Sequence, residues 1–70
     1  MDVGTSVVLT CSFEELLNIC VGEEEANLIL NDVGVVKRTF NAGDTIEVYF
    51  PKIAYIGVNY WFEPNMLKVI

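Results

Sequence analysis

The sequence predicts a mainly-β domain, a small five-stranded barrel that carries one short helical insertion. Three observations lead to this expectation: short β-branched segments recur along the chain, isolated glycines separate them, and a capped amphipathic segment interrupts them early. Short strands bent at glycines are typical of small barrels. The 70 residues make a single domain, residues 1–70, near the lower size limit for a core without metals or disulfides.

The N-terminal segment predicts a strand followed by a helix. Residues 6–11 are short and β-branched, as in a first strand. Ser12 and Glu15 then form a capping-box pattern, in which the Ser12 hydroxyl accepts from the Glu15 amide and the Glu15 carboxylate reaches back. We expect a helix over about residues 13–21, ended by Gly22 in the left-handed region. Its apolar face comprises Phe13, Leu16, Leu17 and Cys20.

Residues 23–30 suit two structures equally. Glu23-Glu24-Glu25 places acids where the N-terminus of a helix favours them. Leu28-Ile29-Leu30, in contrast, is an apolar run that is short enough for an extended segment. We expect a helical turn over the acids that runs into a loop.

Beyond residue 32 the pattern becomes that of strands and turns. Val33-Gly34-Val35-Val36 opens the second strand, and its glycine predicts a bend or bulge where a curved barrel needs close backbone approach. Asn41-Ala42-Gly43-Asp44 predicts the following turn. Residues 45–50 then alternate between two faces. The inward set is Ile46, Val48 and Phe50, and the outward set is Thr45, Glu47 and Tyr49.

The C-terminal third predicts two more strands. Pro51 ends the third strand, and Gly57 marks the next turn. In the fourth strand the inward set is Val58, Tyr60 and Phe62, and the outward set is Asn59 and Trp61. Glu63-Pro64-Asn65 predicts a single 3₁₀ turn before the last strand, residues 67–70.

The order of these elements is that of a five-stranded SH3-like barrel. The helical insertion lies between strands 1 and 2, and a turn precedes the fifth strand. An OB-type barrel is the nearest alternative, but it normally carries its helix between strands three and four. The early helix therefore favours the SH3-like layout.

In three places the chain resembles the small peripheral photosystem I protein that folds as an SH3-like barrel. The matching segments are Gly4–Leu9, Asn31–Val36 and Phe50–Asn59. This resemblance implies the fold. That family has a basic face for its redox partner, whereas this chain is acidic, so the docking role is not implied.

The chain is also similar to the SH3-type repeats of mind-bomb ubiquitin ligases. The matching residues are Ser12-Phe13-Glu14-Glu15-Leu16, Val33-Gly34-Val35-Val36 and Tyr60-x-Phe62-x-Pro64-x-x-Leu67. Those repeats occur in tandem and bind substrate peptides, so the resemblance implies a protein-binding barrel. The chain further resembles small bacteriophage proteins of this build, which commonly bind a host or viral protein.

The charge is unevenly distributed along the chain. The net charge of −6 opposes nonspecific attraction to nucleic acids and anionic membranes. Residues 1–32 contain seven acids and no base, whereas all four bases lie in the second half. The bases are Lys37, Arg38, Lys52 and Lys68. No apolar stretch can span a bilayer and no signal peptide is evident, so we expect a cytoplasmic protein without membrane contact.

Several residue types that support catalysis or ligand binding are missing. The chain has no histidine, and Cys11 and Cys20 have neither a base nor a neighbouring lysine. We expect both cysteines to be buried thiols rather than a disulfide. Glu23-Glu24-Glu25 cannot place all three acids around one ion, and no glycine-rich phosphate loop is present. The sequence therefore predicts no enzyme, metal or cofactor.

Trp61 is the strongest candidate for a binding residue. Strand alternation places it on the outer face together with Tyr49, and exposed aromatic patches usually mark contact surfaces. The alternative is that the early helix, through Leu16 or Leu17, or a lysine stem covers Trp61. Tyr55, in a loop, is a weaker candidate.

These observations favour a noncatalytic protein-interaction module, a small regulator or inhibitor that binds a larger host or viral protein. One alternative is an acidic nucleic-acid mimic that occupies a basic groove and uses acids such as Glu23, Glu24 and Glu25. A second is an accessory component of a larger complex. Four bases against ten acids argue against direct nucleic-acid binding, and a homo-oligomer that pairs through the edge at Ile70 is a further alternative.

Overall fold

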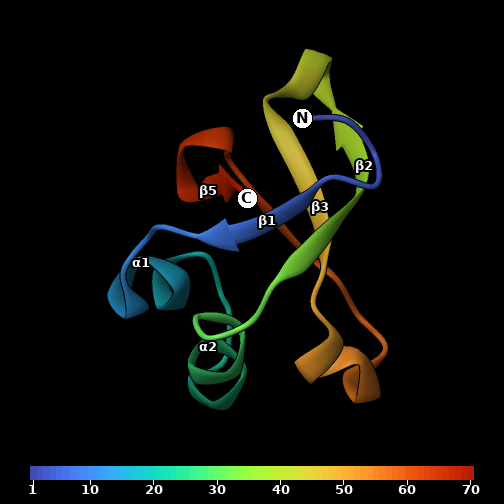
Figure 1. The fold of residues 1–70 in the computed structure, drawn as a ribbon. Helices are drawn as coiled ribbons and strands as arrows, with labels where there is room; N and C mark the ends of the chain where they lie inside the picture. The colour runs from blue at the N-terminus through green and yellow to red at the C-terminus, as the bar shows by residue number, and fades with distance from the viewer.

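The computed structural model describes residues 1–70 and contains one five-stranded antiparallel sheet with short helices (Figure 1). In chain order the elements are β1 (Ser6–Leu9), α1 (Phe13–Asn18), α2 (Glu23–Ile29), β2 (Gly34–Phe40), η1 (Asn41–Gly43), β3 (Thr45–Tyr49), η2 (Pro51–Ile56), β4 (Tyr60–Phe62), η3 (Pro64–Met66) and β5 (Leu67–Val69). The strand order is β4-β3-β2-β1-β5, so β4 and β5 are the two edges of an open sheet. The predicted mainly-β class, the five strands and the helical insertion after β1 are confirmed.

Helix α1 begins as the capping box predicts. The Glu15 amide donates to Ser12 Oγ at 3.1 Å, and the Ser12 amide donates to Glu15 Oε1 at 3.1 Å. The predicted end at residue 21 is wrong, because the helix ends at Asn18. The first turn is therefore set by local sequence, and the end of the helix is set by the packing of the residues after it.

The α1 terminus is a Schellman motif with Cys20 in the left-handed position. Cys20 has φ +69°, its amide donates to Leu17 O, and the Val21 amide donates to Leu16 O. Gly22 was predicted to terminate the helix, but it has φ −66° and precedes α2 as its N-cap. Because the helix ends earlier than predicted, the Val21 side chain is buried in the core and the Cys20 side chain is exposed. Cys20 therefore does not belong to the apolar face of α1.

Residues 23–29 form a complete helix, so the expected helical turn followed by a loop is too short. Ala26 and Ile29 are fully buried on one side of α2. Their spacing of three places them on one face, while the acids Glu23 to Glu25 occupy the first turn. Burial of this face explains why the segment remains helical.

The start of β2 approaches β3 closely. A Cβ at Gly34 would lie 2.8 Å from Phe50 Cε1 and would also collide with the Val48 side chain. The close approach predicted at this glycine is therefore present. The register shift, however, lies between Val36 and Arg38 instead of at Gly34 itself.

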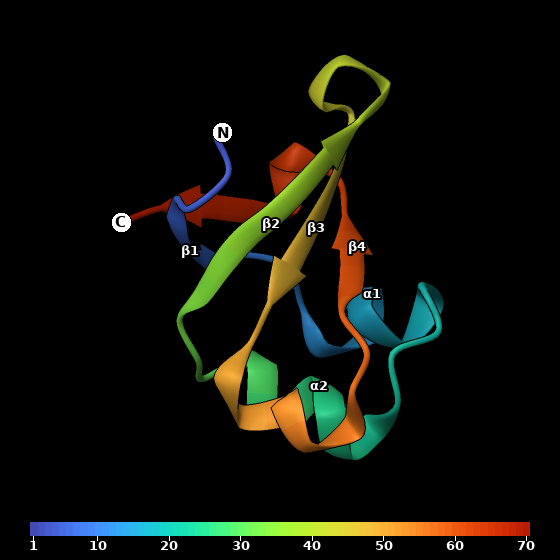
Figure 2. The same cartoon turned by 90° about the vertical axis from the view of Figure 1, so that its right-hand side faces the viewer.

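The core lies between the inner face of the sheet and the two helices. Ile46, Val48 and Phe50 are at most 1% exposed, which confirms the predicted inward set of β3. The Phe50 and Phe62 rings meet edge-on with centroids 6.0 Å apart. Figure 2 shows α1 and α2 at the end of the β2–β3 hairpin opposite the η1 turn.

The chain beyond β3 follows the predicted turns but not every predicted side-chain direction. Pro51 opens η2, Gly57 has φ +81°, and η3 is the predicted 3₁₀ turn before β5. Phe62 is buried, but Val58 is 51% exposed, so its inward assignment is wrong. Strand alternation does not extend to Val58, because β4 begins only at Tyr60. No helix in the structure has the length and apolar character that crossing a membrane requires.

Candidate functional site

The outer face of β2, β3 and β4 carries a buried carboxylate beneath exposed side chains. Glu47 has only 6% of its surface exposed, although it occupies an outward position of β3. Its neighbours across the two ladders are Arg38 on β2 and Trp61 on β4. We call the surface formed by Lys37, Arg38, Phe40, Glu47, Tyr49, Asn59 and Trp61 the Trp61 face.

Both oxygens of the Glu47 carboxylate accept hydrogen bonds. Oε1 accepts from Arg38 Nε at 3.0 Å and from Trp61 Nε1 at 3.2 Å, and it lies 2.8 Å from Arg38 Nη2. Oε2 accepts from Asn59 Nδ2 at 3.0 Å. No buried polar side-chain atom in the structure lacks a partner. The carboxylate is therefore a fixed acceptor that holds three surrounding side chains in place.

The same contacts stabilise the charged form of Glu47. The hydrogen bond from the Asn59 amide makes the largest contribution, and it lowers the pKa of Glu47 below its ordinary value. Burial raises the pKa, but the donors on Arg38 and Trp61 and the Arg38 charge lower it further. Because the pKa of the carboxylate is lowered and both of its oxygens already accept hydrogen bonds, its arrangement does not favour a general base.

The Trp61 side chain is exposed to solvent, but its indole ring is held in one orientation. More than half of its surface, 57%, is exposed, while its indole N–H is held by Glu47. The Phe40 ring lies beside it, with centroids 5.3 Å apart and planes tilted by 46°. Leu16, which the sequence offered as a possible cover, lies wholly in the core instead.

Tyr49 lies on the same face as Trp61. It is two residues from Glu47 along β3, is half-buried, and has the Lys37 ammonium 5.3 Å from its ring centroid. The register shift in β2 makes this possible, because Lys37 and the adjacent Arg38 both reach this side of the sheet. The structure therefore brings together the two aromatic residues that the sequence analysis paired.

The other predicted binding residues lie elsewhere. Tyr55 is 73% exposed but belongs to η2, which packs against α2. Glu23 and Glu24 are exposed, and Glu25 is half-buried, in the first turn of α2. The six predicted residues thus lie in three parts of the fold: Tyr49 and Trp61 on the outer face of the sheet, the three glutamates in the first turn of α2, and Tyr55 on η2.

Five members of the Trp61 face were not among the predicted binding residues: Lys37, Arg38, Phe40, Glu47 and Asn59. Alternation had already placed Asn59 beside Trp61 and Glu47 beside Tyr49 on the outward side. A carboxylate between two outward aromatic residues was the available signal for a polar cluster. The register shift that brings Arg38 to Glu47 has no comparable signal in the sequence.

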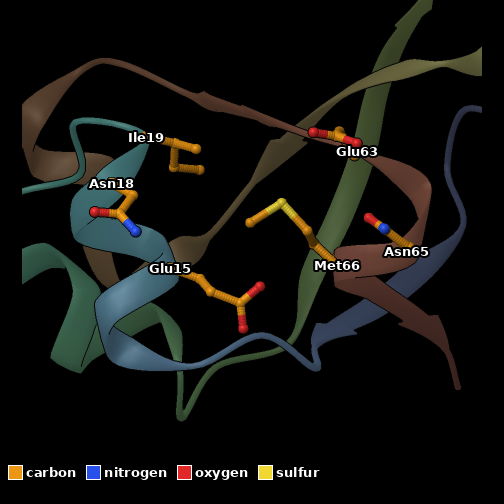
Figure 3. A pocket seen from close by; sticks show the side chains of 6 residues that line it. All are labelled: Glu15, Asn18, Ile19, Glu63, Asn65 and Met66. Carbon is orange, nitrogen blue, oxygen red and sulfur yellow. The ribbon is translucent and has the colours of Figure 1, made fainter.

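A shallow groove lies between α1 and η3 (Figure 3). Its volume is about 230 Å³, and Figure 3 shows the Met66 side chain reaching from η3 toward α1. The lining residues are Glu15, Asn18, Ile19, Glu63, Asn65 and Met66. This lining contains two carboxylates and no base, and it joins segments that are far apart in the sequence.

The structure contains no group of three or more histidine, cysteine or acidic residues that could hold a metal ion. Cys11 and Cys20 are both unpaired thiols. Burial is the main cause that raises the pKa of the Cys11 thiol, so its thiolate form is disfavoured. The expectation of two buried thiols is wrong for Cys20, which the left-handed turn exposes.

Comparison with known proteins adds no further information: no family model, curated protein or solved structure matches the chain. The resemblances to the photosystem I protein and to mind-bomb repeats therefore stay predictions.

Proposed function

We propose that this chain is a noncatalytic protein-binding domain with an SH3-like barrel fold, a small regulator or inhibitor that binds a larger protein through the Trp61 face. The strand order β4-β3-β2-β1-β5, with a 3₁₀ turn between β4 and β5, supports the SH3-like layout. A phage origin would fit this build.

One observation carries the proposal: Trp61 is 57% exposed, yet its indole N–H is held by a buried carboxylate. Ordering a mobile side chain on binding costs roughly 0.5–1.5 kcal/mol. A tryptophan that is already fixed avoids much of this cost and presents a large apolar area to a partner. Such an arrangement is typical of a binding anchor.

The noncatalytic part of the proposal rests on Glu47 and on Cys11, which lies outside the Trp61 face. Glu47 is occupied by donors from three side chains, and the Cys11 thiol has a raised pKa. Neither group offers an available base or nucleophile. The chemistry of the face therefore favours recognition over catalysis.

The acids of the N-terminal half have structural roles that weaken the nucleic-acid mimic as an alternative. Glu15 closes the capping box of α1, and Glu23 to Glu25 stabilise the N-terminus of α2. Acids placed for helix stability need no binding partner. We therefore rank the Trp61 face above the acidic surface as the contact site.

The proposal is tested by comparing Trp61→Ala with Tyr55→Ala in affinity capture from the native host and in binding to the captured protein. Both variants remove a large exposed aromatic side chain, from different elements. We expect Trp61→Ala to weaken binding at least about 10-fold, as for a hot spot, and Tyr55→Ala to leave it nearly unchanged. The Trp61→Phe variant keeps a ring against Phe40 and serves as a second check on folding. Unchanged binding by a folded Trp61→Ala variant contradicts the proposal.

A further inference from the structure

We infer that the partner presents a carboxylate next to an apolar side chain, with Arg38 and Lys37 receiving the carboxylate and the Phe40–Trp61 pair receiving the apolar group. This inference rests on the proposed protein-binding function and specifies the chemistry of the partner. Its basis is the charge of the Trp61 face, which differs in sign from that of the rest of the molecule.

Half of the basic side chains in the chain lie at this face. Lys37 and Arg38 are adjacent on β2, and the register shift between Val36 and Arg38 brings both to the outer side. Glu47 is the one acid of the face, and it is buried and bonded to Arg38. The surface that a partner meets here is therefore positive.

Arg38 retains hydrogen-bonding capacity after it has bound Glu47. The ion pair uses Nε and Nη2, both directed at Oε1. A guanidinium has five N–H donors, and Nη1 makes no hydrogen bond within the chain. The Arg38 side chain is 65% exposed. A carboxylate from outside can therefore bind the free edge of the guanidinium without displacing Glu47.

Lys37 is a second cation without an acidic partner. Its ammonium lies over the Tyr49 ring, a contact that leaves its N–H donors available. The Arg38–Glu47 pair is the one salt bridge of the structure. Lys37 therefore adds a second available cation to the face beside Arg38.

The apolar part of the site is formed by two tilted rings. Phe40 and Trp61 are 5.3 Å apart at 46°, and the Arg38 guanidinium lies 5.6 Å from the Phe40 ring centroid. Because Glu47 accepts the indole N–H, Trp61 offers hydrocarbon surface rather than a donor to the partner. This surface fits a leucine, methionine or aromatic side chain beside the cationic edge.

The charge distribution favours a local carboxylate over a nucleic acid. Outside this face the chain has nine acids and two bases, and the molecule measures 29 × 22 × 20 Å. At physiological salt, charges are screened beyond about 8 Å, so a small acidic contact at the face is little affected by acids that lie farther away than this. A polyanion that extends beyond the face meets those acids directly.

The experiment titrates the ¹⁵N-labelled full chain with three acetylated and amidated heptapeptides. The first alternates glutamate with leucine and phenylalanine between terminal glycines, and the other two carry glutamine or lysine in place of glutamate. The indole N–H signal of Trp61 and the Nε–H signal of Arg38 report binding at the face. We expect the glutamate peptide to bind several-fold more tightly than the glutamine peptide, and the lysine peptide to bind most weakly.

Two charge-matched variants test the role of Lys37. Lys37→Gln and Lys68→Gln each remove one exposed positive charge, from β2 and from β5. An exposed ion pair contributes about 0.2–1 kcal/mol, which is about a 1.4- to 5-fold change in affinity. We expect this loss for the glutamate peptide with Lys37→Gln and no loss with Lys68→Gln. Equal effects of the two variants overturn the inference.

The outcomes separate this inference from the proposed function. If the glutamine or lysine peptide binds the face as tightly as the glutamate peptide, the stated partner chemistry is wrong while a protein-binding face remains. If none of the peptides moves the two reporter signals, the inference fails, and the Trp61→Ala capture experiment then decides the proposed function independently. Tighter binding of an eight-residue oligothymidylate than of the glutamate peptide assigns the face to nucleic acid and overturns the inference.

Discussion

Replacing Glu47 by glutamine removes the charge at the centre of the Trp61 face while nearly preserving its shape. The substituted amide has one acceptor oxygen and one donor group, whereas the native carboxylate accepts from Arg38, Trp61 and Asn59. The new amide donor then either faces a native donor or pairs with the Asn59 oxygen after that amide rotates. In both cases the variant loses the ion pair and the charge-assisted strength of the remaining hydrogen bonds.

The magnitude follows from these contacts. A hydrogen bond to a charged group contributes about 1.5–3 kcal/mol, but Arg38 is 65% exposed and recovers part of its loss by hydration. We expect Glu47→Gln to lower the free energy of unfolding by about 2 kcal/mol. A 70-residue domain has roughly 4–10 kcal/mol in total, so this loss is easily measured.

The effect depends on pH with a definite sign. The folded-state pKa of Glu47 lies below the ordinary value of 4.5, so its stabilisation is complete above that value and is lost as the pH falls through the folded-state pKa. We expect the difference between the native chain and Glu47→Gln to be constant from pH 8 to about 6 and to shrink on further acidification.

The assay is urea unfolding followed by the fluorescence of Trp61, the single tryptophan of the chain. Glu63→Gln, which changes an exposed acid near the groove, is the matched control and should leave stability within about 0.5 kcal/mol. Equal stabilities of the native chain and Glu47→Gln at pH 7 would refute the structural role of the carboxylate. A difference that does not change between pH 7 and pH 3 would refute the assigned direction of the pKa shift.

Two further substitutions test the backbone. Cys20→Gly should stabilise the chain by about 0.5–1 kcal/mol. The conformation at φ +69° costs a residue with a side chain about 1–2 kcal/mol, and glycine avoids this cost but loses part of the gain because its unfolded chain has more conformational entropy. A loss of stability in urea unfolding would contradict the Schellman assignment. Gly34→Ala should destabilise by about 2 kcal/mol or more, because the added Cβ meets the buried Val48 and Phe50 side chains. Gly57→Ala has no such contact and should lose only the roughly 1–2 kcal/mol that φ +81° costs a residue with a side chain. An unchanged urea midpoint for Gly34→Ala would contradict the close approach of β2 to β3.

Local patterns were sufficient to predict the parts of the fold that depend on nearest neighbours. The capping box at Ser12, the alternation along β3 and the turn before β5 all depend on residues within a few positions of one another. The end of α1 depends on whether Cys20 or Val21 enters the core, which is a choice made by packing. Glycine at residue 22 was the better candidate for a left-handed position, and the demand of the core for Val21 outweighed it.

The candidate site was predictable in its position but not in its construction. Alternation placed Tyr49 and Trp61 on one face because side-chain direction in a strand is a local property. The partners of Glu47 are not local: Arg38 reaches it only through the register shift, and Asn59 lies just outside β4. An outward glutamate reads as a solvated side chain until its cross-strand neighbours are known, which is why its burial could not be foreseen.

The location of this polar cluster explains why binding and folding can be varied separately. The apolar core lies on the inner side of the sheet, whereas Glu47 and Trp61 lie on the outer side, so a change at Trp61 leaves every core contact intact. Truncating Trp61 removes one of the donors to Glu47, and Arg38 and Asn59 still satisfy both carboxylate oxygens. The Trp61→Ala variant should therefore fold, and a loss of binding in it measures the contact itself. Glu47→Gln acts in the reverse way, because it retains the indole but weakens the acceptor that holds its N–H, so any loss of binding in that variant reports how much the fixed orientation of Trp61 contributes.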